Sequence, residues 1–568
     1  MDIHFFEPGM IKPTGWIATQ LRVLSEGFFP SLLYNCDEIG KSYWLVGDAD
    51  PSGELFPVWF EGFVRLAYMS DNEKMKETAG KCVSKILGKQ EKNGWLSIFP
   101  AKEDTDLYPS FLMLNALIVY AQHSSDKTVY DAILRAVKAI DFHTDNFALT
   151  KNAHARFSVI KNVIDFLYKL TEDSFLTELS KKLECQAFSW ERYENSIARN
   201  SRWSDAYNNA LSLRMLPFSS FKEFDEKFVL ACGSVSGVRF LERVSASAGS
   251  ATSTMFEYLA TLLTVFEKNT FSLVYDKIEN LIFNAYFASV NPTMTAVQKY
   301  EKLNQINASF NSSASLETVS FGKVLPEFVS SCVVRTEDGF CVNSYIPFTA
   351  DLQYNGTPVR IETISEYPFR DSVKIVVTCP EPVSFTLSLR IPSWADEVRI
   401  SAGSSPIYPL KNSFYKFTGI WSDVSEITLS FSADFKITRR EDDLFTLSRG
   451  ILLYAMPVDG KKTFENGKGE SSYLLSASSD WSFGLVMANK DAIYKEISYE
   501  EKPVAQLPFS VLTPPVEAYM YAKRVEWQIK DGEPVKKPLA VRASEKKEMI
   551  KLVPYGCKAL RITAFPKA

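Results

Sequence analysis

The apolar residues of this chain repeat at helical spacing up to about residue 335 and at strand spacing after about residue 340. Segment 71–95 illustrates the first pattern, because its apolar residues recur at steps of three and four: Met75, Ala79, Cys82, Val83, Ile86 and Leu87. This spacing predicts an amphipathic helix, and the following Asn93-Gly94 predicts its end. Further helical segments, paired through short polar turns, predict a toroid of helical hairpins.

The second pattern is an alternation of apolar and polar residues between Pro, Gly, Asn and Asp turns. Segment 384–391 shows it clearly, with Phe385, Leu387, Leu389 and Ile391 at every second position. Such alternation predicts antiparallel strands with one buried face. We therefore expect a multidomain α + β protein with a helical domain at 1–340, a β-sandwich at 341–440 and a second β-rich domain at 441–568.

The net charge of the chain and the length of its apolar runs argue against several classes of protein. The formal net charge is −5 over 568 residues, which predicts neither a nucleic-acid nor an anionic-membrane partner. The sequence starts without the features of a secretory signal, and the best apolar run, FLMLNALIVYA, is too short to cross a bilayer. The eight cysteines are scattered singly. We expect a soluble cytoplasmic protein with buried, reduced thiols.

Several ordered blocks resemble glycoside hydrolase family 127, the β-L-arabinofuranosidase-like proteins. They are KPTGWIATQL, FPVWFEGFVRLAY, ILGKQEKNGW, DKIENLIFNAYFA, YEKLNQI, LRIPSW and LSRGILLYAMP. The resemblance implies an (α/α)6 toroid followed by β-sandwich domains, and a carbohydrate as substrate or ligand. It also implies, for the family, a zinc ion held by one Glu and three Cys, one of these thiolates being the nucleophile of a retaining reaction.

Residues of this chain depart from that family pattern at the metal site. The family's Glu-x-Cys precedes a helical Glu, placed at Glu257, and falls on Ala251 and Ser253. The family's Cys-Cys pair falls on Leu316 and Glu317. Because one carboxylate is not a zinc site, we expect neither zinc nor any other cofactor.

The acid/base position changes as well. The family's catalytic Glu falls on Arg239, and a family His falls on Asp205, while a nearby Asn is kept as Asn208. A guanidinium favours carboxylate or phosphate groups, so Arg239 indicates an acidic sugar. The scaffold is thus recognisable, with its metal, nucleophile and acid/base positions all replaced.

Three carboxylates are candidates for a replacement chemistry. Glu317 stands at the inherited nucleophile position and is either a nucleophile or base, or a solvated loop carboxylate. Asp205 is either its partner or the N-cap of the following helix. Glu242 is either a displaced acid close to Arg239 or a member of a surface ion pair.

Candidates for binding the sugar come from the helical half. Trp59, Tyr108 and Trp203 are either stacking surfaces for sugar rings or core residues. Glu61 either accepts hydrogen bonds from sugar hydroxyls or pairs inside the barrel, and Asn208 is a further polar contact. Two functions remain open: a glycoside hydrolase of non-reducing-end sugars that uses carboxylates, and a catalytically silent carbohydrate-binding or regulatory relative. The oligomeric state stays undetermined.

Overall fold

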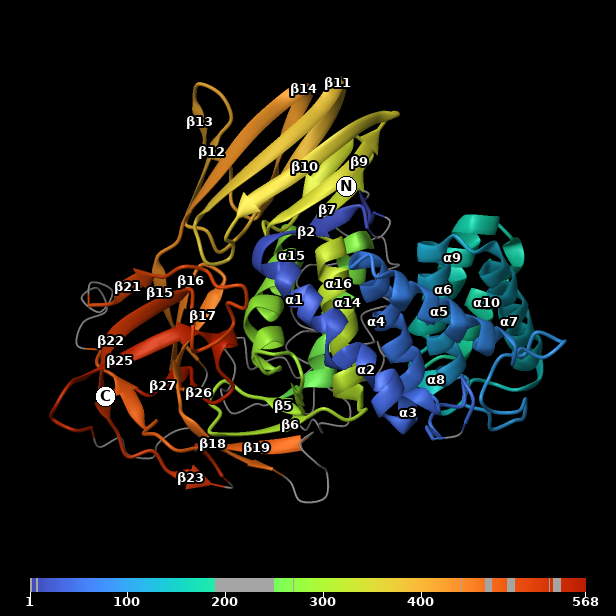
Figure 1. Ribbon diagram of the computed structural model, residues 1–568, viewed down its shortest axis with the longest axis horizontal. Helices are drawn as coiled ribbons and strands as arrows, with labels where there is room; N and C mark the ends of the chain where they lie inside the picture. The colour runs from blue at the N-terminus through green and yellow to red at the C-terminus, as the bar shows by residue number, and fades with distance from the viewer. Residues whose placement is uncertain are drawn as a thin grey trace.

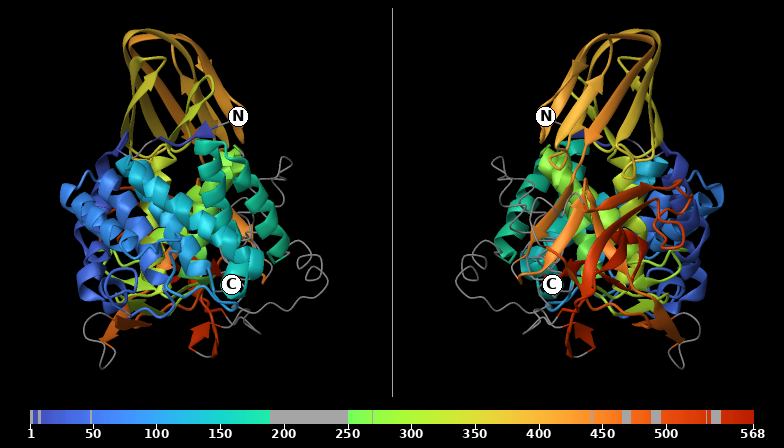
Figure 2. Two further views of the ribbon diagram at one scale, coloured as in Figure 1. Left: turned by 90° about the vertical axis from the view of Figure 1, so that its right-hand side faces the viewer. Right: turned by 90° about the vertical axis from the view of Figure 1, so that its left-hand side faces the viewer.

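The structure is a computed structural model in which a helical domain carries two β domains (Figure 1). The β-sandwich stands above the helices in both side views, and the C-terminal β domain lies beside them (Figure 2). The described residues are 3–6, 9–47, 49–188, 250–268, 270–440, 442–464, 472–487, 496–530, 532–534 and 543–568. Within them, no helix is long and apolar enough to cross a membrane.

Paired helices build the first domain, as the helical spacing predicts. The helix predicted in segment 71–95 is α5, Glu73–Leu87, whose N-cap Asn72 accepts a hydrogen bond from the backbone of Met75. The other described helices are α1 (Gly15–Glu26), α2 (Phe28–Asn35), α3 (Asp37–Gly40), α4 (Leu55–Met69), α6 (Tyr108–Ser124), α7 (Lys127–Asn146), α8 (Lys151–Ala155), α9 (Ser158–Thr171), α10 (Ser174–Gln186), α14 (Thr252–Lys268), α15 (Ser272–Asn280) and α16 (Leu316–Ser330). Helices α4 and α5, α6 and α7, and α9 and α10 pack as consecutive hairpins.

Helix α16 approaches both α4 and α2 closely at two glycines. A Cβ on Gly62 of α4 would lie 2.9 Å from the backbone nitrogen of Lys323, and one on Gly322 of α16 would lie 2.2 Å from the ring of Phe29 on α2. Larger residues would push the helices apart. The glycines therefore allow the polar side chains next to them on α4 and α16 to lie close to one another.

The middle domain is a mainly antiparallel β structure, as the alternation predicts, with one parallel pair between β8 and β11. Its described strands are β1 (Ile3–His4), β2 (Ile11–Pro13), β7 (Val333–Thr336), β8 (Gly339–Val342), β9 (Phe348–Tyr354), β10 (Thr357–Ser365), β11 (Ser372–Ile391), β12 (Glu397–Ser401), β13 (Pro406–Ile407) and β14 (Ser413–Ser432). The alternating residues of 384–391 are buried on β11. Strand β11 pairs along most of its length with β14.

Strands from outside the expected middle segment complete this sheet. The N-terminal β1 pairs with β7, and β2 pairs with β9. The hairpin of β7 and β8 is continuous across the expected boundary at 340, with Val334 opposite Cys341. The division expected at that residue therefore falls inside a strand, and Ile3 and His4 lie in the same sheet as the middle segment.

The third domain is a mainly antiparallel β structure. Its main sheet contains β15 (Phe435–Arg439), β16 (Phe445–Arg449), β17 (Leu452–Pro457), β20 (Phe483–Leu485), β21 (Ser498–Glu501), β22 (Val516–Arg524), β25 (Glu548–Pro554), β26 (Arg561–Ile562) and β27 (Ala564–Phe565). A second sheet joins β18 (Gly460–Phe464) and β19 (Ser472–Ala477) to β6 (Asn307–Asn311) and β4 (Val297–Gln298) of the helical half. The chain runs from β6 into α16, so this sheet borders the start of that helix.

Buried ion pairs connect the domains. Arg390, in the LRIPSW block of β11, is fully buried and donates hydrogen bonds to Asp276 and Glu279 of α15. Arg561 of the third domain donates to Glu301 of the helical half at 2.7 Å. A buried charge without its partner costs several kcal/mol, so these pairs strongly favour one arrangement of the domains.

Candidate functional site

The N-terminal ends of α14 and α16 bring together the positions that the resemblance assigns to metal ligands. Strand β3 (Ser250–Ala251) leads directly into α14, and it pairs with β5 (Tyr300–Glu301). Ser315 caps α16 through a capping box with Thr318, which fixes Glu317 in the first turn. Ser253 Oγ then lies 3.4 Å from Glu317 Oε1. Two of the four positions therefore meet by hydrogen bond.

These residues do not fit a zinc ion. Ala251 and Leu316 offer no side-chain ligand atom, which leaves one hydroxyl and one carboxylate where structural and catalytic zinc sites use three or four protein ligands. No group of three or more His, Cys, Asp or Glu suited to a metal occurs in the described parts of the chain. Zinc therefore takes no part in the chemistry that these residues can perform.

The thiols nearest to Glu317 in the sequence are unreactive. Cys332 and Cys341 are fully buried. Burial raises the pKa of both thiols well above the usual value, so neither forms the thiolate that a nucleophile requires. They are core residues in the structure.

Glu257, one turn after Ser253 on α14, is held by two residues of α16. Ser320 Oγ donates to it at 3.3 Å, and Lys323 Nζ lies 3.3 Å from its Oε1. Lys323 is buried. Burial alone would lower the pKa of Lys323, but the carboxylates of Glu257 and Glu61 raise it above its usual value. The lysine therefore remains a cation and neutralises Glu257.

A second wall of the site comes from the loops around α4, α6 and α8. The guanidinium carbon of Arg156 lies 4.6 Å from the ring centroid of Tyr108 and interacts with Glu54 and Glu257. Burial raises the pKa of Tyr108 to about 12. Burial also raises the pKa of Glu54, against the opposing effect of Arg156, while Asn152 donates to Glu54 at 3.1 Å. Glu54 is thus a carboxyl group with acid character.

We call these residues together the central cluster: Glu54, Tyr108, Arg156, Ser253, Glu257, Glu317, Ser320 and Lys323. Its members come from α4, α6, α8, α14, α16 and the residues that flank them. Helices α14 and α16 pack side by side, and α16 packs on α4, in the middle of the helical domain (Figure 1). The cluster combines carboxylates, cations and hydroxyl groups, which are groups that hydrogen-bond sugar hydroxyls.

Comparison with known proteins relates this architecture to carbohydrate-active enzymes. Residues 339–433 match the family model described as beta-L-arabinofuranosidase, GH127 middle domain. This segment is similar to a GH127 middle domain. The resemblance found in the sequence blocks is thereby confirmed for the middle domain, and for the rest of the chain it is confirmed at the level of the fold by solved structures.

Those structures align with the GH127-like chain over its whole length. A protein described as a glycoside hydrolase has a TM-score of 0.71 at 12% identity, with 100% of this chain and 98% of that chain covered. A GH127 beta-arabinofuranosidase has 0.70 at 13% identity, with 100% and 98% covered. A GH127 beta-L-arabinofuranosidase from Geobacillus stearothermophilus has 0.67 at 12%, with 100% of both covered. A comparison with curated proteins finds no match.

Some of the predicted site residues lie in the central cluster, and others lie in the core. Glu317 and Tyr108 belong to the central cluster of this GH127-like fold. Trp59 is fully buried among Phe29, Phe56 and Phe63, and its indole nitrogen donates to the carbonyl of Phe29 at 2.9 Å. Its rings have no open face for a sugar, which agrees with the core alternative.

Glu61 pairs inside the barrel. It accepts hydrogen bonds from Arg65 at 3.0 Å and from Asn115 at 3.2 Å. Burial would raise the pKa of Glu61, but Lys323 and Arg65 lower it below its usual value. The remaining candidates lie outside the described residues: Asp205, Glu242, Trp203, Asn208 and Arg239.

Sequence reasoning missed Glu54, Arg156 and Lys323. For Lys323 there was a signal, because Ser320 and Lys323 follow Glu317 at helical steps of three and therefore share one face of α16. For Glu54 and Arg156 the signal is weak, since they lie in short connections about 100 residues apart.

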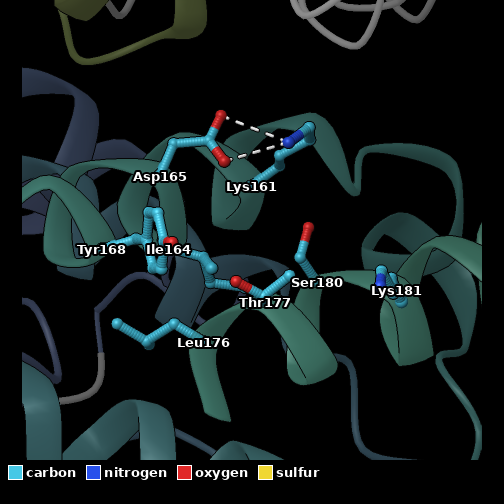
Figure 3. Close-up of a pocket in the computed structure, with 8 residues that line it drawn as sticks. All are labelled: Lys161, Ile164, Asp165, Tyr168, Leu176, Thr177, Ser180 and Lys181. Atoms are coloured by element: carbon cyan, nitrogen blue, oxygen red, sulfur yellow. Dashed lines mark hydrogen bonds and ion pairs between the residues drawn. The ribbon is translucent and has the colours of Figure 1, made fainter. Parts of the chain in front are cut away.

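A separate hollow lies between α9 and α10 (Figure 3). It has a volume of about 210 Å³ and contains Lys161, whose amine donates to both oxygens of Asp165 at 2.9 and 3.2 Å. Leu176 and Ile164 form its apolar side. Its lining includes no residue of the central cluster, so the hollow is distinct from the candidate site.

Proposed function

We propose that this chain hydrolyses O-glycosyl bonds at the non-reducing end of plant-type or other glycans, with carboxylates in place of zinc–thiolate chemistry. The contact between Ser253 and Glu317 carries the proposal, because it joins two residues that the resemblance assigns to ligand positions of the family's metal site. Glu317 is partly exposed in the first turn of α16, where substrate can reach it. The helix N-terminus also favours its negative charge.

In this proposal Glu317 acts as nucleophile or base, and a second carboxyl group acts as the acid. Glycosidases pair an ionised carboxylate with a carboxyl group that holds its proton. Glu54 is a candidate for the acid because burial raises its pKa. Asp205 and Glu242 remain candidates from the sequence. An acidic sugar as substrate rests on Arg239 and remains part of the proposal.

The second candidate function is a catalytically silent carbohydrate-binding relative. The observation that favours it is the state of Glu257, whose charge is neutralised by Lys323 and whose Oε1 also accepts from Ser320. A carboxylate with these two partners is already engaged in an ion pair and a hydrogen bond. Polar groups of the central cluster would then bind sugar hydroxyls without breaking a bond.

The replacement Glu317→Gln distinguishes the two functions. It keeps the shape of the side chain and removes the charge, so a nucleophile or base role predicts a loss in kcat of at least about 100-fold, with little change in sugar affinity. Wild type is screened with aryl glycosides of neutral and acidic sugars, including β-L-arabinofuranosides, and ligand binding is followed by thermal shift. Glu73→Gln is the matched control, because Glu73 also lies in the first turn of a helix.

The possible outcomes distinguish the hydrolase from the silent binder. Turnover that falls in Glu317→Gln and persists in Glu73→Gln supports the hydrolase. Turnover that is equal in all three proteins removes Glu317 from the mechanism. Sugar-induced stabilisation of wild type with no turnover of any glycoside establishes the silent binder.

A further inference from the structure

Five charged side chains, two of which belong to the central cluster, are packed together between α4, α14 and α16. Three are carboxylates, Glu61, Glu257 and Glu327, and two are cations, Arg65 and Lys323. Glu61, Glu327 and Lys323 are each less than one tenth exposed. The close approach at Gly62 and Gly322 brings these side chains together. With every group ionised, the set would carry one unbalanced negative charge.

Each cation already has a carboxylate at short range. Arg65 donates through both Nε and Nη2 to Glu61 Oε1, at 3.3 and 3.0 Å. Lys323 contacts Glu257 at 3.3 Å. These two pairs account for both cations and for two of the three carboxylates.

Glu327 is the carboxylate left over. Its Oε1 lies 3.9 Å from Arg65 Nη2, beyond hydrogen-bond distance, and its Oε2 is buried with no hydrogen-bond partner among the described residues. An ionised carboxylate in that setting would lose its hydration without receiving donors in return. The neutral acid loses much less.

We propose that Glu327 is a largely protonated, neutral acid on the acid side of pH 7, and that this leaves Arg65 to Glu61 and Lys323 to Glu257. In this role Glu327 is a positioning residue, because it acts on the central cluster through Lys323. If Glu327 were ionised, it would compete with Glu257 for the lysine. The inference does not depend on whether the protein hydrolyses glycans.

The charged surroundings agree with this assignment. Burial raises the pKa of Glu327 to about 7, with Glu61 and Glu257 raising it further and Arg65 and Lys323 opposing. Glu61 and Arg65 face it from α4, Glu257 from α14 and Lys323 from its own helix. Glu267 contributes to the raised pKa of Arg65, while burial and then Arg65 lower the pKa of His123.

The test is the sign of the effect of Glu327→Gln on stability. The amide mimics the neutral acid, so the variant should fold and be at least as stable as wild type at pH 8. Because the folded-state pKa of Glu327 is raised from 4.5 to about 7, its contribution to stability is complete below pH 4.5 and is lost as the pH rises through 7. The unfolding equilibrium constant of wild type relative to the variant should therefore rise on the order of 100-fold between pH 4.5 and 8.

Glu61→Gln is the matched control within the same cluster. The pKa of Glu61 is lowered, so its contribution is present above pH 4.5 and disappears only on acidification below that value. This variant should be less stable than wild type throughout pH 5 to 8, whereas Glu327→Gln should not be. Melting temperatures of the three full-length proteins over this range provide the comparison.

Two results would overturn the proposal. One is a Glu327→Gln protein that is less stable than wild type at pH 8, or that fails to fold, since either would show that Glu327 is needed as an anion paired with Arg65. The other is a difference between Glu327→Gln and wild type that is independent of pH. A stable variant whose advantage grows with pH supports the proposal.

Discussion

Ser253 and Glu317 lie in hydrogen-bond contact, with 3.4 Å between Oγ and Oε1, although 64 residues separate them in the chain. The two positions correspond by resemblance to two metal ligands of GH127 enzymes. Under that resemblance, a hydroxyl–carboxylate pair stands where the family has two metal ligands, at the N-terminal ends of α14 and α16.

The first prediction is that zinc binding returns when the ligands are restored. The purified protein should hold no stoichiometric zinc after dialysis, because one carboxylate and one hydroxyl are too few ligands. The combined replacement Ala251→Glu, Ser253→Cys, Leu316→Cys and Glu317→Cys should bind about one zinc ion per chain. Metal analysis of both proteins by mass spectrometry checks this, and zinc retained by wild type would contradict it.

A second prediction concerns the thiols. Cys185 is exposed and should react with iodoacetamide first, whereas the buried Cys332 and Cys341 should react at least about 100-fold more slowly in the folded protein. Any glycosidase activity should survive the modification of Cys185. Peptide mass spectrometry over time measures each rate. Rapid alkylation of Cys332 or Cys341 with loss of activity, before unfolding, would show a reactive thiol.

Third, Lys323→Met should destabilise the helical domain by about 1 to 3 kcal/mol, because Glu257 loses its cation while remaining partly buried. Adding Glu257→Gln should restore part of that loss, since the unpaired charge is then removed. Lys81→Met is the control, because Lys81 pairs with Glu77 at 2.7 Å on an exposed surface. Urea denaturation measures all of these proteins, and equal losses for Lys81→Met and Lys323→Met would contradict the assignment.

The fourth prediction tests the junction between the helical domain and the sandwich. Arg390→Met leaves Asp276 and Glu279 buried without their cation and should cost about 3 to 5 kcal/mol. Arg360→Met, at an exposed pair with Asp351, should change stability by less than about 0.5 kcal/mol. Thermal unfolding with limited proteolysis at the junction checks both. A small loss of stability in Arg390→Met would mean that apolar packing alone holds the two domains together.

The local pattern of the sequence was enough to predict the elements. Spacing by three and four gave α5, and alternation gave β11 with Phe385, Leu387, Leu389 and Ile391 buried, because these patterns depend on neighbours within one helix or strand. These features need no knowledge of the rest of the chain. The assignment of the family's ligand positions rests on the resemblance and stays a prediction.

The tertiary structure decided which surfaces meet. It placed β1 and β2 in the sandwich, buried Trp59 while placing Tyr108 beside Arg156, and brought Lys323 to Glu257 across two helices. Each of these outcomes depends on contacts between segments far apart in sequence, where the size of a glycine or the desolvation of a charge determines the distance. Periodicity identifies the buried face of an element, but the packing of whole domains determines what that face touches.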